Sequence, residues 1–195
     1  MKEIRTETIT TSFLAGMMIG IGDIALLSVE NSAIGAFLFS TALLSIIALQ
    51  LPLYTGRIGK VIKNGTYVYC LVILLCNIAG CCASLWFFML MREDGKTLVL
   101  QTADRKAQMG FLQLFIAGVL CNILIHIAVT AKREVITVLC VMAFILCGFR
   151  HSIADAGYAV LGHHLLPWLF VLLGNTAGGL LCEYLLFPQR SGQKA

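Results

Sequence analysis

The sequence predicts an all-α membrane protein with six transmembrane helices in two inverted three-helix repeats, and three observations support this fold class. Hydrophobic residues make up 59% of the 195 residues and charged residues only 12%, and the mean hydropathy is +0.90. A soluble domain carries about a quarter charged residues, so this chain has too little polar surface to face water on every side. The other two observations are a series of long apolar runs and a pair of motifs that occur twice.

Six apolar runs have about the length of a membrane-spanning helix, which needs roughly 20 residues. Four of them contain no Asp, Glu, Lys or Arg, and these are residues 33–54, 66–91, 109–131 and 165–182. Two are interrupted by charge, because residues 8–29 contain Asp23 and residues 135–158 contain Arg150 and Asp155. Charged groups in a membrane helix cost about 2.5–3.5 kcal/mol each, so these three must face the protein interior or pair with one another.

The charge distribution predicts that both termini face the cytoplasm, because Lys and Arg are enriched in cytoplasmic connections. With the N-terminus inside, the nine basic residues of the inner side are Lys2, Arg5, Arg57, Lys60, Lys63, Lys132, Arg133, Arg190 and Lys194. The outer side then has four, all within residues 92–106, the longest connection, which we expect to be a loop. The expected organisation in the inner cell membrane is a cytoplasmic segment (residues 1–10), one transmembrane domain (residues 11–187) and a cytoplasmic tail (residues 188–195).

Two pairs of motifs indicate an internal repeat. Phe-Leu-Ala-Gly ending at Gly16 matches Phe-Ile-Ala-Gly ending at Gly118, and Leu-Cys-Asn-Ile-Ala-Gly around Asn77 matches Leu-Gly-Asn-Thr-Ala-Gly around Asn175. The offsets, 102 and 98 residues, are nearly equal. The two halves are residues 11–91 and 108–187. Each half has three spans, an odd number, so the second half must be inverted, as in many transporters whose site lies near the midplane.

Helix breakers interrupt the second and the fifth span. Pro52 and Gly56 stand in Leu-Pro-Leu-Tyr-Thr-Gly-Arg, and Gly148 stands in Cys-Gly-Phe-Arg-His-Ser. Thr55 and His151, which follow the breakers, are 96 residues apart, close to the repeat offset. Broken backbone at membrane depth is tolerated where it is buried in protein or lines a cavity. His151 is the leading candidate for chemistry, because an imidazole can donate a hydrogen bond or a proton to a passing anion near neutral pH.

Four motifs, in order, resemble those of the formate/nitrite transporter family, and the resemblance covers about residues 11–187. The motifs are Leu53-Tyr54-Thr55-Gly56, Gly118-Val119-Leu120-Cys121-Asn122, Gly148-Phe149-Arg150-His151-Ser152 and Leu173-Gly174-Asn175. The resemblance implies an aquaporin-like bundle with broken second and fifth helices, assembled as a homopentamer with one pore per protomer. It implies small monovalent anions (formate, nitrite, hydrosulfide or short carboxylates) and protons as the transported partners, with membrane lipid around the assembly.

The same resemblance assigns roles to individual polar residues. His151 matches the family's central proton or hydrogen-bond donor, and Thr55 matches its partner across the pore. Lys106 matches a lysine that attracts anions, and Asn122 and Asn175 match two pore asparagines.

Two hydrophobic constrictions follow from the resemblance in the same way. Phe39, Leu43 and Phe144 match an outer constriction. Leu53 and Tyr54 match an inner one.

The chain departs from the family pattern beside the central histidine. Arg150 stands where the family has Glu, and Asp155 stands where it usually has Asn. We expect the Arg150 cation to disfavour a charged imidazolium at His151 and to raise the positive potential there.

Other functions are less well supported by the sequence. The eight cysteines lie in apolar runs without metal-site spacing, and we expect no cofactor, no metal, no nucleic-acid partner and no enzymatic activity. A pore for neutral small solutes on the same fold stays open. An intramembrane enzyme or metal-binding protein would use His126, His163, His164 and the cysteines.

Overall fold

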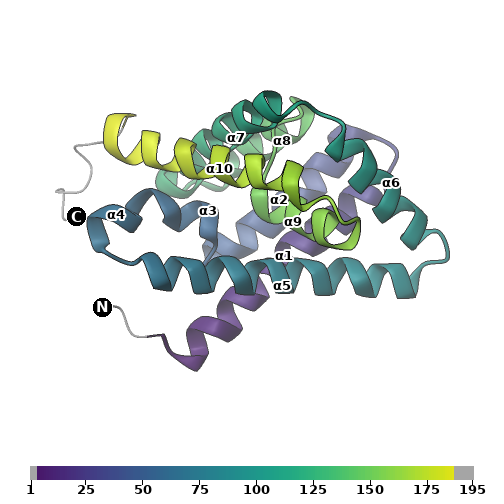
Figure 1. The fold of residues 1–195 in the computed structure, drawn as a ribbon, viewed down its shortest axis with the longest axis horizontal. Helices are drawn as coiled ribbons and strands as arrows, with labels where there is room; N and C mark the ends of the chain where they lie inside the picture. Colours follow the sequence, from purple (N-terminus) through teal and green to yellow (C-terminus); the bar gives the residue numbers. More distant parts are fainter. Residues whose placement is uncertain (1–3, 187–195) are drawn as a thin grey trace.

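The computed structural model describes residues 4–186, and these are almost entirely helical (Figure 1). The longer helices are α1 (Thr6–Leu27), α2 (Ser32–Ala48), α5 (Tyr67–Met91), α6 (Gly95–Ala107), α7 (Phe111–Ala131), α8 (Glu134–Leu146), α9 (Ser152–Leu161) and α10 (Leu165–Leu181). The short ones are α3 (Tyr54–Arg57), η1 (Ile58–Lys60), α4 (Val61–Asn64) and η2 (Cys182–Leu186). The predicted tail, residues 188–195, lies outside the described residues, as do the first three residues of the predicted N-terminal segment.

Four helical stretches of the described chain are long and apolar enough to cross a bilayer: α1, α5, α7, and α10 continued to Leu185. The chain is therefore an all-α integral membrane protein. Helices α2 and α8 are apolar but have only 17 and 13 residues. They rise about 26 and 20 Å, less than the roughly 30 Å hydrocarbon core. Each is followed by a non-helical segment and a further short helix, α3 after α2 and α9 after α8.

Helices α2 and α8 end in the same backbone motif. At the end of α2, Leu51 N–H donates to the Ile46 carbonyl (2.9 Å), and Gln50 has a φ of 54°. At the end of α8, Phe149 N–H donates to the Phe144 carbonyl (2.8 Å), and Gly148 has a φ of 72°. This pattern, with one residue in the left-handed region, is the Schellman motif that terminates helices. The break predicted in the second span therefore lies at residues 49–53, between α2 and α3.

One expectation about the other elements needs correction. The predicted loop over residues 92–106 contains α6, because Val99 and Ala103 lie one helical turn apart and are both buried. The first span, with Asp23 inside it, is α1, one continuous helix of 22 residues. The Asp23 side chain is buried, as expected for a charged group in a membrane helix.

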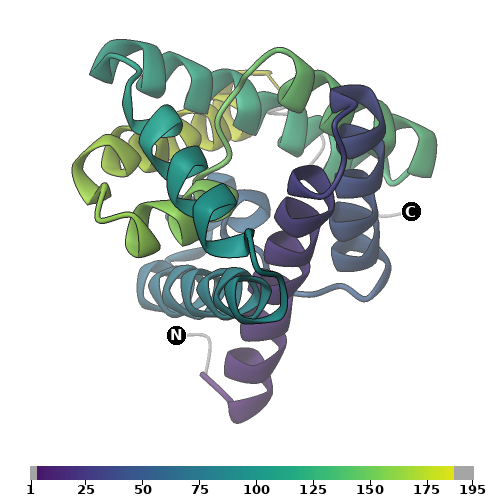
Figure 2. The same cartoon turned by 90° about the vertical axis from the view of Figure 1, so that its right-hand side faces the viewer.

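Two helix pairs, α1 with α5 and α7 with α10, pack backbone against backbone. Figure 2 looks along α5 and shows α1 crossing it. A Cβ added at Gly16 would overlap the Asn77 carbonyl of α5. A Cβ added at Gly118 would lie 2.7 Å from the Val171 carbonyl of α10. Small residues allow such close approach in membranes, where van der Waals packing drives helix association.

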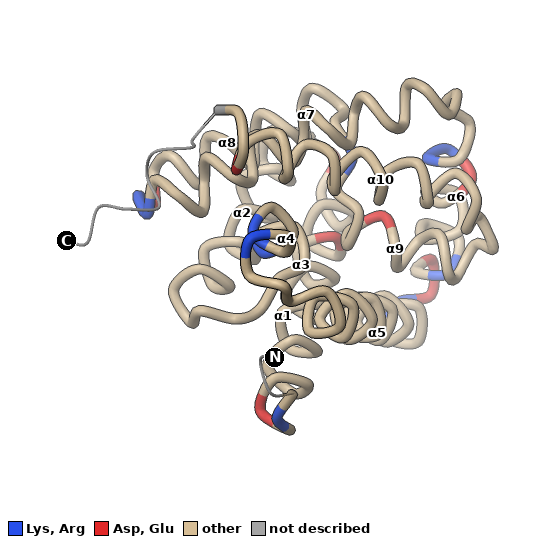
Figure 3. The backbone as a smooth tube through the Cα atoms, turned by 60° about the vertical axis from the view of Figure 1, so that its left-hand side comes forward, with Lys and Arg blue, Asp and Glu red and all other residues tan. Residues whose placement is uncertain are grey.

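Polar groups gather at the ends of the molecule and at its centre. Most of the tube in Figure 3 is tan, and charged positions concentrate around α4 and α6, with red positions beside α9. Large apolar side chains are exposed along the outer faces of the long helices, among them Leu75, Phe87, Leu90, Leu112 and Ile116. Large exposed apolar faces of this kind mark a membrane or protein interaction surface.

Candidate functional site

Two asparagines hold the two broken segments in place. The Asn77 amide donates to the carbonyls of Ser12 (2.7 Å) and Pro52 (3.0 Å), and its oxygen accepts from Tyr54 N–H (2.9 Å). Asn77 is completely buried. A side-chain amide with two donors and one oxygen suits backbone groups freed by a helix break, because each of them would otherwise be buried without a partner.

Asn175 makes the equivalent set of bonds in the second half of the chain. Its amide donates to the carbonyls of Gly118 (2.9 Å) and Arg150 (2.8 Å), and its oxygen accepts from Ser152 N–H (2.9 Å). The two asparagines thus fix the start of α3 and the start of α9 by the same geometry. The family resemblance implies a pore position for Asn175, whereas these three hydrogen bonds of its side chain all go to backbone groups.

The segments fixed in this way bring Thr55 and His151 together. Thr55 Oγ1 lies 3.1 Å from His151 Nε2, and both side chains are buried, with 3% exposure each. His151 Nδ1 accepts from the backbone N–H of Ala154 (3.2 Å), so the imidazole also caps the start of α9. A backbone N–H can only donate, so Nδ1 carries no proton in this arrangement and the proton of the neutral ring is on Nε2. The ring therefore points a hydrogen-bond donor at Thr55.

Aromatic rings cover the Thr55–His151 pair on one side. The Phe144 ring stacks on the His151 ring at 6.0 Å between centroids, and Phe39 meets Phe144 edge to face, also at 6.0 Å. Phe39 and Phe144 are both buried. Of the two phenylalanines predicted for the outer constriction, Phe144 thus lies against His151 and Phe39 lies against Phe144.

A cavity of about 840 Å³ lies at the end of the protomer where α2 ends and α8 begins. We call it the vestibule. Leu43, which was grouped with Phe39 and Phe144, lines it together with Leu53. Its charged lining residues are Arg57, Lys60, Lys132, Arg133 and Glu134. Basic side chains from two connections far apart in sequence thus surround one cavity.

Tyr54 and Asn122 lie in the same inner region of the protomer. The Tyr54 hydroxyl is 2.8 Å from Thr176 Oγ1, and its ring is buried. Asn122 is completely buried and donates to the Asn175 carbonyl (2.7 Å). The side-chain oxygen of Asn122 has no hydrogen-bond partner among the described residues, so this acceptor is unsatisfied.

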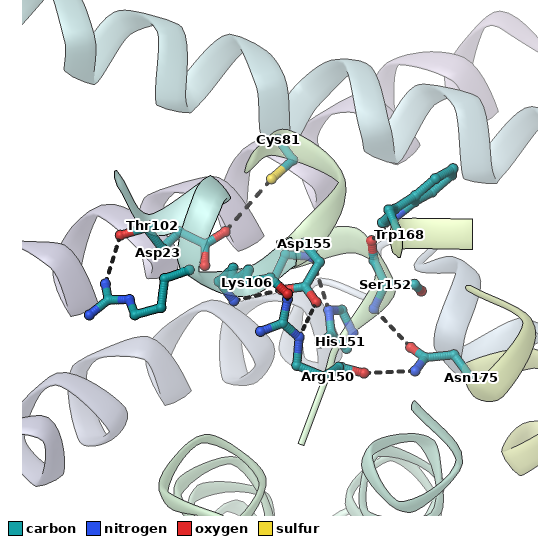
Figure 4. A network of polar contacts seen from close by, with 12 residues as sticks. Asp23, Cys81, Thr102, Lys106, Arg150, His151, Ser152, Asp155, Trp168 and Asn175 are labelled. Atoms are coloured by element: carbon teal, nitrogen blue, oxygen red, sulfur yellow. Dashed lines mark hydrogen bonds and ion pairs between the residues drawn. The ribbon is translucent and has the colours of Figure 1, made fainter. Parts of the chain in front are cut away.

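Of the three charges expected to face the interior or pair with one another, Arg150 and Asp155 form an ion pair, which also includes Lys106 (Figure 4). Asp155 Oδ2 accepts from Arg150 Nε (2.7 Å), and Asp155 Oδ1 accepts from Lys106 Nζ (2.6 Å). Arg150 also donates to the Lys106 carbonyl (3.3 Å), and the Lys106 ammonium lies 5.1 Å from the centre of the Tyr158 ring. One buried carboxylate thus serves two cations. Asp155 therefore offsets much of the positive potential that Arg150 was expected to raise.

Several polar contacts near this site were not expected from the sequence. Asp23 is 1% exposed and accepts from the Cys81 thiol (3.8 Å) on α5. The Trp168 indole donates to the Ser152 carbonyl (2.7 Å), which braces the turn after His151. The presence of Asp23 in an apolar run was a sequence signal for its contact with Cys81. No comparable signal pointed to the tryptophan, because its partner is a backbone group.

Two of the predicted alternative residues, His163 and His164, lie in the turn between α9 and α10. His164 pairs with Asp104 of α6 (2.8 Å), and His163 is exposed. Within residues 4–186, no three His, Cys, Asp or Glu side chains gather in an arrangement that could hold a metal ion.

Comparison with known proteins gives consistent matches. The sequence model of the formate/nitrite transporter family matches residues 2–187. The formate channel FocA of Escherichia coli strain K12 is 32% identical over 140 residues, which cover 62% of this chain and 45% of that one. FocA of Escherichia coli O157:H7 gives the same identity and coverage. The chain thus spans about half the length of these relatives.

Solved structures show the same fold. A pentameric formate channel with formate bound superposes with a TM-score of 0.81 at 18% identity, covering 96% of this chain and 97% of that one. An FNT family ion channel superposes with a TM-score of 0.76 at 23% identity, covering 96% and 90%.

Proposed function

Since the chain belongs to the formate/nitrite transporter family, we propose that it forms a membrane pore for small monovalent anions such as formate, nitrite, hydrosulfide or short carboxylates. The observation that carries the proposal is the buried Thr55–His151 pair, 3.1 Å apart, at the meeting point of two broken helices. The proposed activity is transport without chemical conversion of the solute. No cofactor is invoked for it.

The proposed architecture is six spans in two inverted three-helix repeats, with α2 and α8 completed by the segments after their breaks. The equivalent hydrogen bonds of Asn77 and Asn175 support it, as do the matching ends of α2 and α8. We further propose a homopentamer with one pore per protomer, by analogy with the pentameric formate channel of the same fold. Both termini are placed in the cytoplasm, and the vestibule with its basic lining then opens to the cytoplasm.

Passage of an anion requires replacement of its lost hydration, because a bare charge is expensive to bury. We assign this replacement to the hydroxyl of Thr55 and the Nε2–H of His151. The Nδ1 contact with Ala154 N–H supports a neutral, fixed ring that donates a hydrogen bond. For His151 to give up a proton, as the family resemblance allows, Nδ1 would first need its own proton in place of that contact. The geometry therefore favours hydrogen-bond donation by His151 over proton donation.

Apolar side chains on both sides of the pair would act as constrictions. Phe39 and Phe144 form the proposed outer one, and Leu53, Tyr54 and the reassigned Leu43 form the inner one. All five are buried in the protomer. Such narrow apolar passages exclude bulk water, which strengthens the hydrogen bonds between them.

The basic residues would concentrate anions at the pore. Lys106 and Arg150 lie on one side, and the vestibule cations lie on the other. A concentration of one sign of charge in a low-dielectric cavity raises the local concentration of the opposite ion. The side-chain amide of Asn122, which lies beside Asn175, would be a further polar group along the path of the anion.

The test is solute uptake into proteoliposomes that contain the purified full chain. Formate, nitrite, hydrosulfide and acetate are supplied separately, with protein-free liposomes as the control. We expect uptake of at least one of these anions above the control. Uptake of none of the four would contradict the proposal.

A second candidate is a pore for neutral small solutes on the same fold. The observation that favours it is the pairing of Lys106 and Arg150 with Asp155, which leaves less positive charge to attract an anion. Voltage-dependent current in a planar bilayer separates the two candidates, because a neutral solute carries none.

A further inference from the structure

We propose that Asp23 links proton binding to anion binding in this pore, so that the pore holds an anion well only when the Asp23 carboxyl is protonated. The inference rests on the proposed function, since it concerns the charge that the anion meets. It assigns a proton-binding role to a residue of α1 that lies outside the broken segments.

The Asp23 carboxyl group receives little direct stabilisation of a negative charge. It is 1% exposed, and the hydrogen bond that the structure gives it comes from the Cys81 thiol at 3.8 Å. A thiol is a weak donor, whereas an ionised carboxylate can accept about four hydrogen bonds. A buried carboxylate with so few donors depends for its charge on nearby cations.

The nearby cations are Lys106 and Arg150, which share the Asp155 carboxylate and form with it the central charge cluster. Lys106, Arg150 and Asp155 all act electrostatically on Asp23. Figure 4 shows the Asp23 carboxyl on the side of the Lys106 ammonium away from His151. The other titratable groups that face Asp23 are Cys81 of α5 and Tyr158 of α9. Helix α2, which packs on α1, contains no titratable residue.

The charge count of this cluster depends on Asp23. Asp155 is shared by Lys106 and Arg150, so these three groups have a net charge of +1. An ionised Asp23 makes the cluster neutral, and a protonated Asp23 leaves it at +1. A monovalent anion beside the cluster restores neutrality only in the second case. In a low-dielectric interior this difference is large, because charges interact much more strongly there than in water.

The proton transfer that this requires is simple. When an anion occupies the centre, a proton from water binds one carboxylate oxygen of Asp23 and converts it to the carboxylic acid. When the anion leaves, the acid returns the proton to water. Water reaches the cluster at Lys106, whose side chain is 25% exposed. A small cavity there is lined by Lys106, Arg150, Asp155 and Tyr158.

His151 and Glu183 are less suited to this role. The Nδ1 atom of His151 is held by Ala154 N–H, which opposes a second proton on the ring. Glu183, another buried carboxylate, has its own cation, because Lys63 Nζ lies 3.1 Å from its oxygen. Glu183 is therefore the matched control for Asp23.

The experiment measures formate uptake into proteoliposomes from about pH 5 to about pH 8 for wild type, Asp23→Asn and Glu183→Gln. At each pH, the variant and the wild type are exposed to the same proportions of formate and formic acid. The ratio of their uptake rates therefore reports the effect of the substituted residue alone. Asn has the shape and neutrality of a protonated Asp. We expect the Asp23→Asn to wild-type ratio to rise with pH by about 5-fold or more. The Glu183→Gln ratio is expected to stay constant.

A constant Asp23→Asn ratio across this pH range would overturn the inference while the proposed function stands. A wild type that takes up no anion at any pH would overturn the proposed function and the inference with it. Elution as a single assembly of wild-type size establishes that each variant is folded. If Asp23→Asn does not meet this standard, Asp23→Ser, a smaller neutral side chain, replaces it in the same comparison.

Discussion

Thr55 Oγ1 and His151 Nε2 lie 3.1 Å apart, although 96 residues separate them in the chain. Each follows a helix that ends in a Schellman motif, and each segment is fixed by a buried asparagine. The contact is thus the product of two equivalent breaks that meet inside the protomer. The accompanying bond from Ala154 N–H to Nδ1 sets which ring nitrogen faces Thr55.

The Thr55 hydroxyl is expected to contribute directly to anion passage. Thr55→Val keeps the shape and removes the hydroxyl, and a hydrogen bond to a charged partner contributes about 1.5–3 kcal/mol. We expect formate uptake to fall by about 10-fold or more. Thr55→Ser keeps the hydroxyl and should retain most of the uptake. Equal uptake by the Val and Ser variants would show that the hydroxyl is not used.

Removal of the Asp155 charge is expected to destabilise the protein. Asp155→Asn leaves Lys106 and Arg150 as buried cations without their carboxylate, which costs about 3 kcal/mol. The measurement is thermal unfolding of the purified protein in detergent. The control is Asp94→Asn, because the Arg92–Asp94 pair is solvent-exposed and contributes about 0–1 kcal/mol. Similar unfolding temperatures for the two variants would contradict the buried pairing.

Asn77 and Asn175 are expected to tolerate Asp poorly. Asp has the same shape and can still accept a backbone N–H, but an ionised carboxylate cannot donate to the two carbonyls that each amide satisfies. We expect Asn77→Asp and Asn175→Asp each to cost about 2–4 kcal/mol, seen as a lower unfolding temperature. Asn64→Asp, at an exposed position of α4, serves as the control. A clear difference between the Asn77 and Asn175 variants would argue against equivalent roles.

The contact between α7 and α10 is expected to require glycine. A Cβ at Gly118 would lie 2.7 Å from the Val171 carbonyl, whereas a Cβ at Gly56 would meet its nearest neighbour, Val129 Cγ2, at 3.6 Å. Gly118→Ala should therefore lower the stability by about 1–3 kcal/mol. Gly56→Ala, which inserts the same methyl group, should change the unfolding temperature little. The same loss in both variants would mean that the close approach is not the reason.

Sequence reasoning identified the helix breaks because their signals are local. Pro52 and Gly148 mark the two interruptions. The cost of charge in lipid predicted that the charged groups of the spans face the interior or pair with one another, as Arg150 and Asp155 do. The residue at which the first break begins was harder to predict from the sequence. Helix α2 already ends at Ala48, through a left-handed Gln50, which is an unusual residue for that conformation.

The features that sequence reasoning missed depend on tertiary contacts. Helix α6 is polar overall, and its buried side is evident only once α5 and α9 pack against it. Leu43 lies on the same helix as Phe39, and only the cavity shows that it lies with Leu53. The sharing of Asp155 by Lys106 and Arg150 joins two distant parts of the chain, because Lys106 lies on α6. The number of spans and the inverted relation of the two halves stay predictions.

The central claim, a small-anion pore through the Thr55–His151 contact, is tested most directly by formate uptake into proteoliposomes with wild type and His151→Ala. The matched control is His163→Asn, at an exposed position with a φ of 61°, which Asn tolerates. We predict uptake by wild type and His163→Asn, and a loss of about 10-fold or more in His151→Ala, because no other donor replaces Nε2–H. Equal uptake by all three proteins would contradict the account.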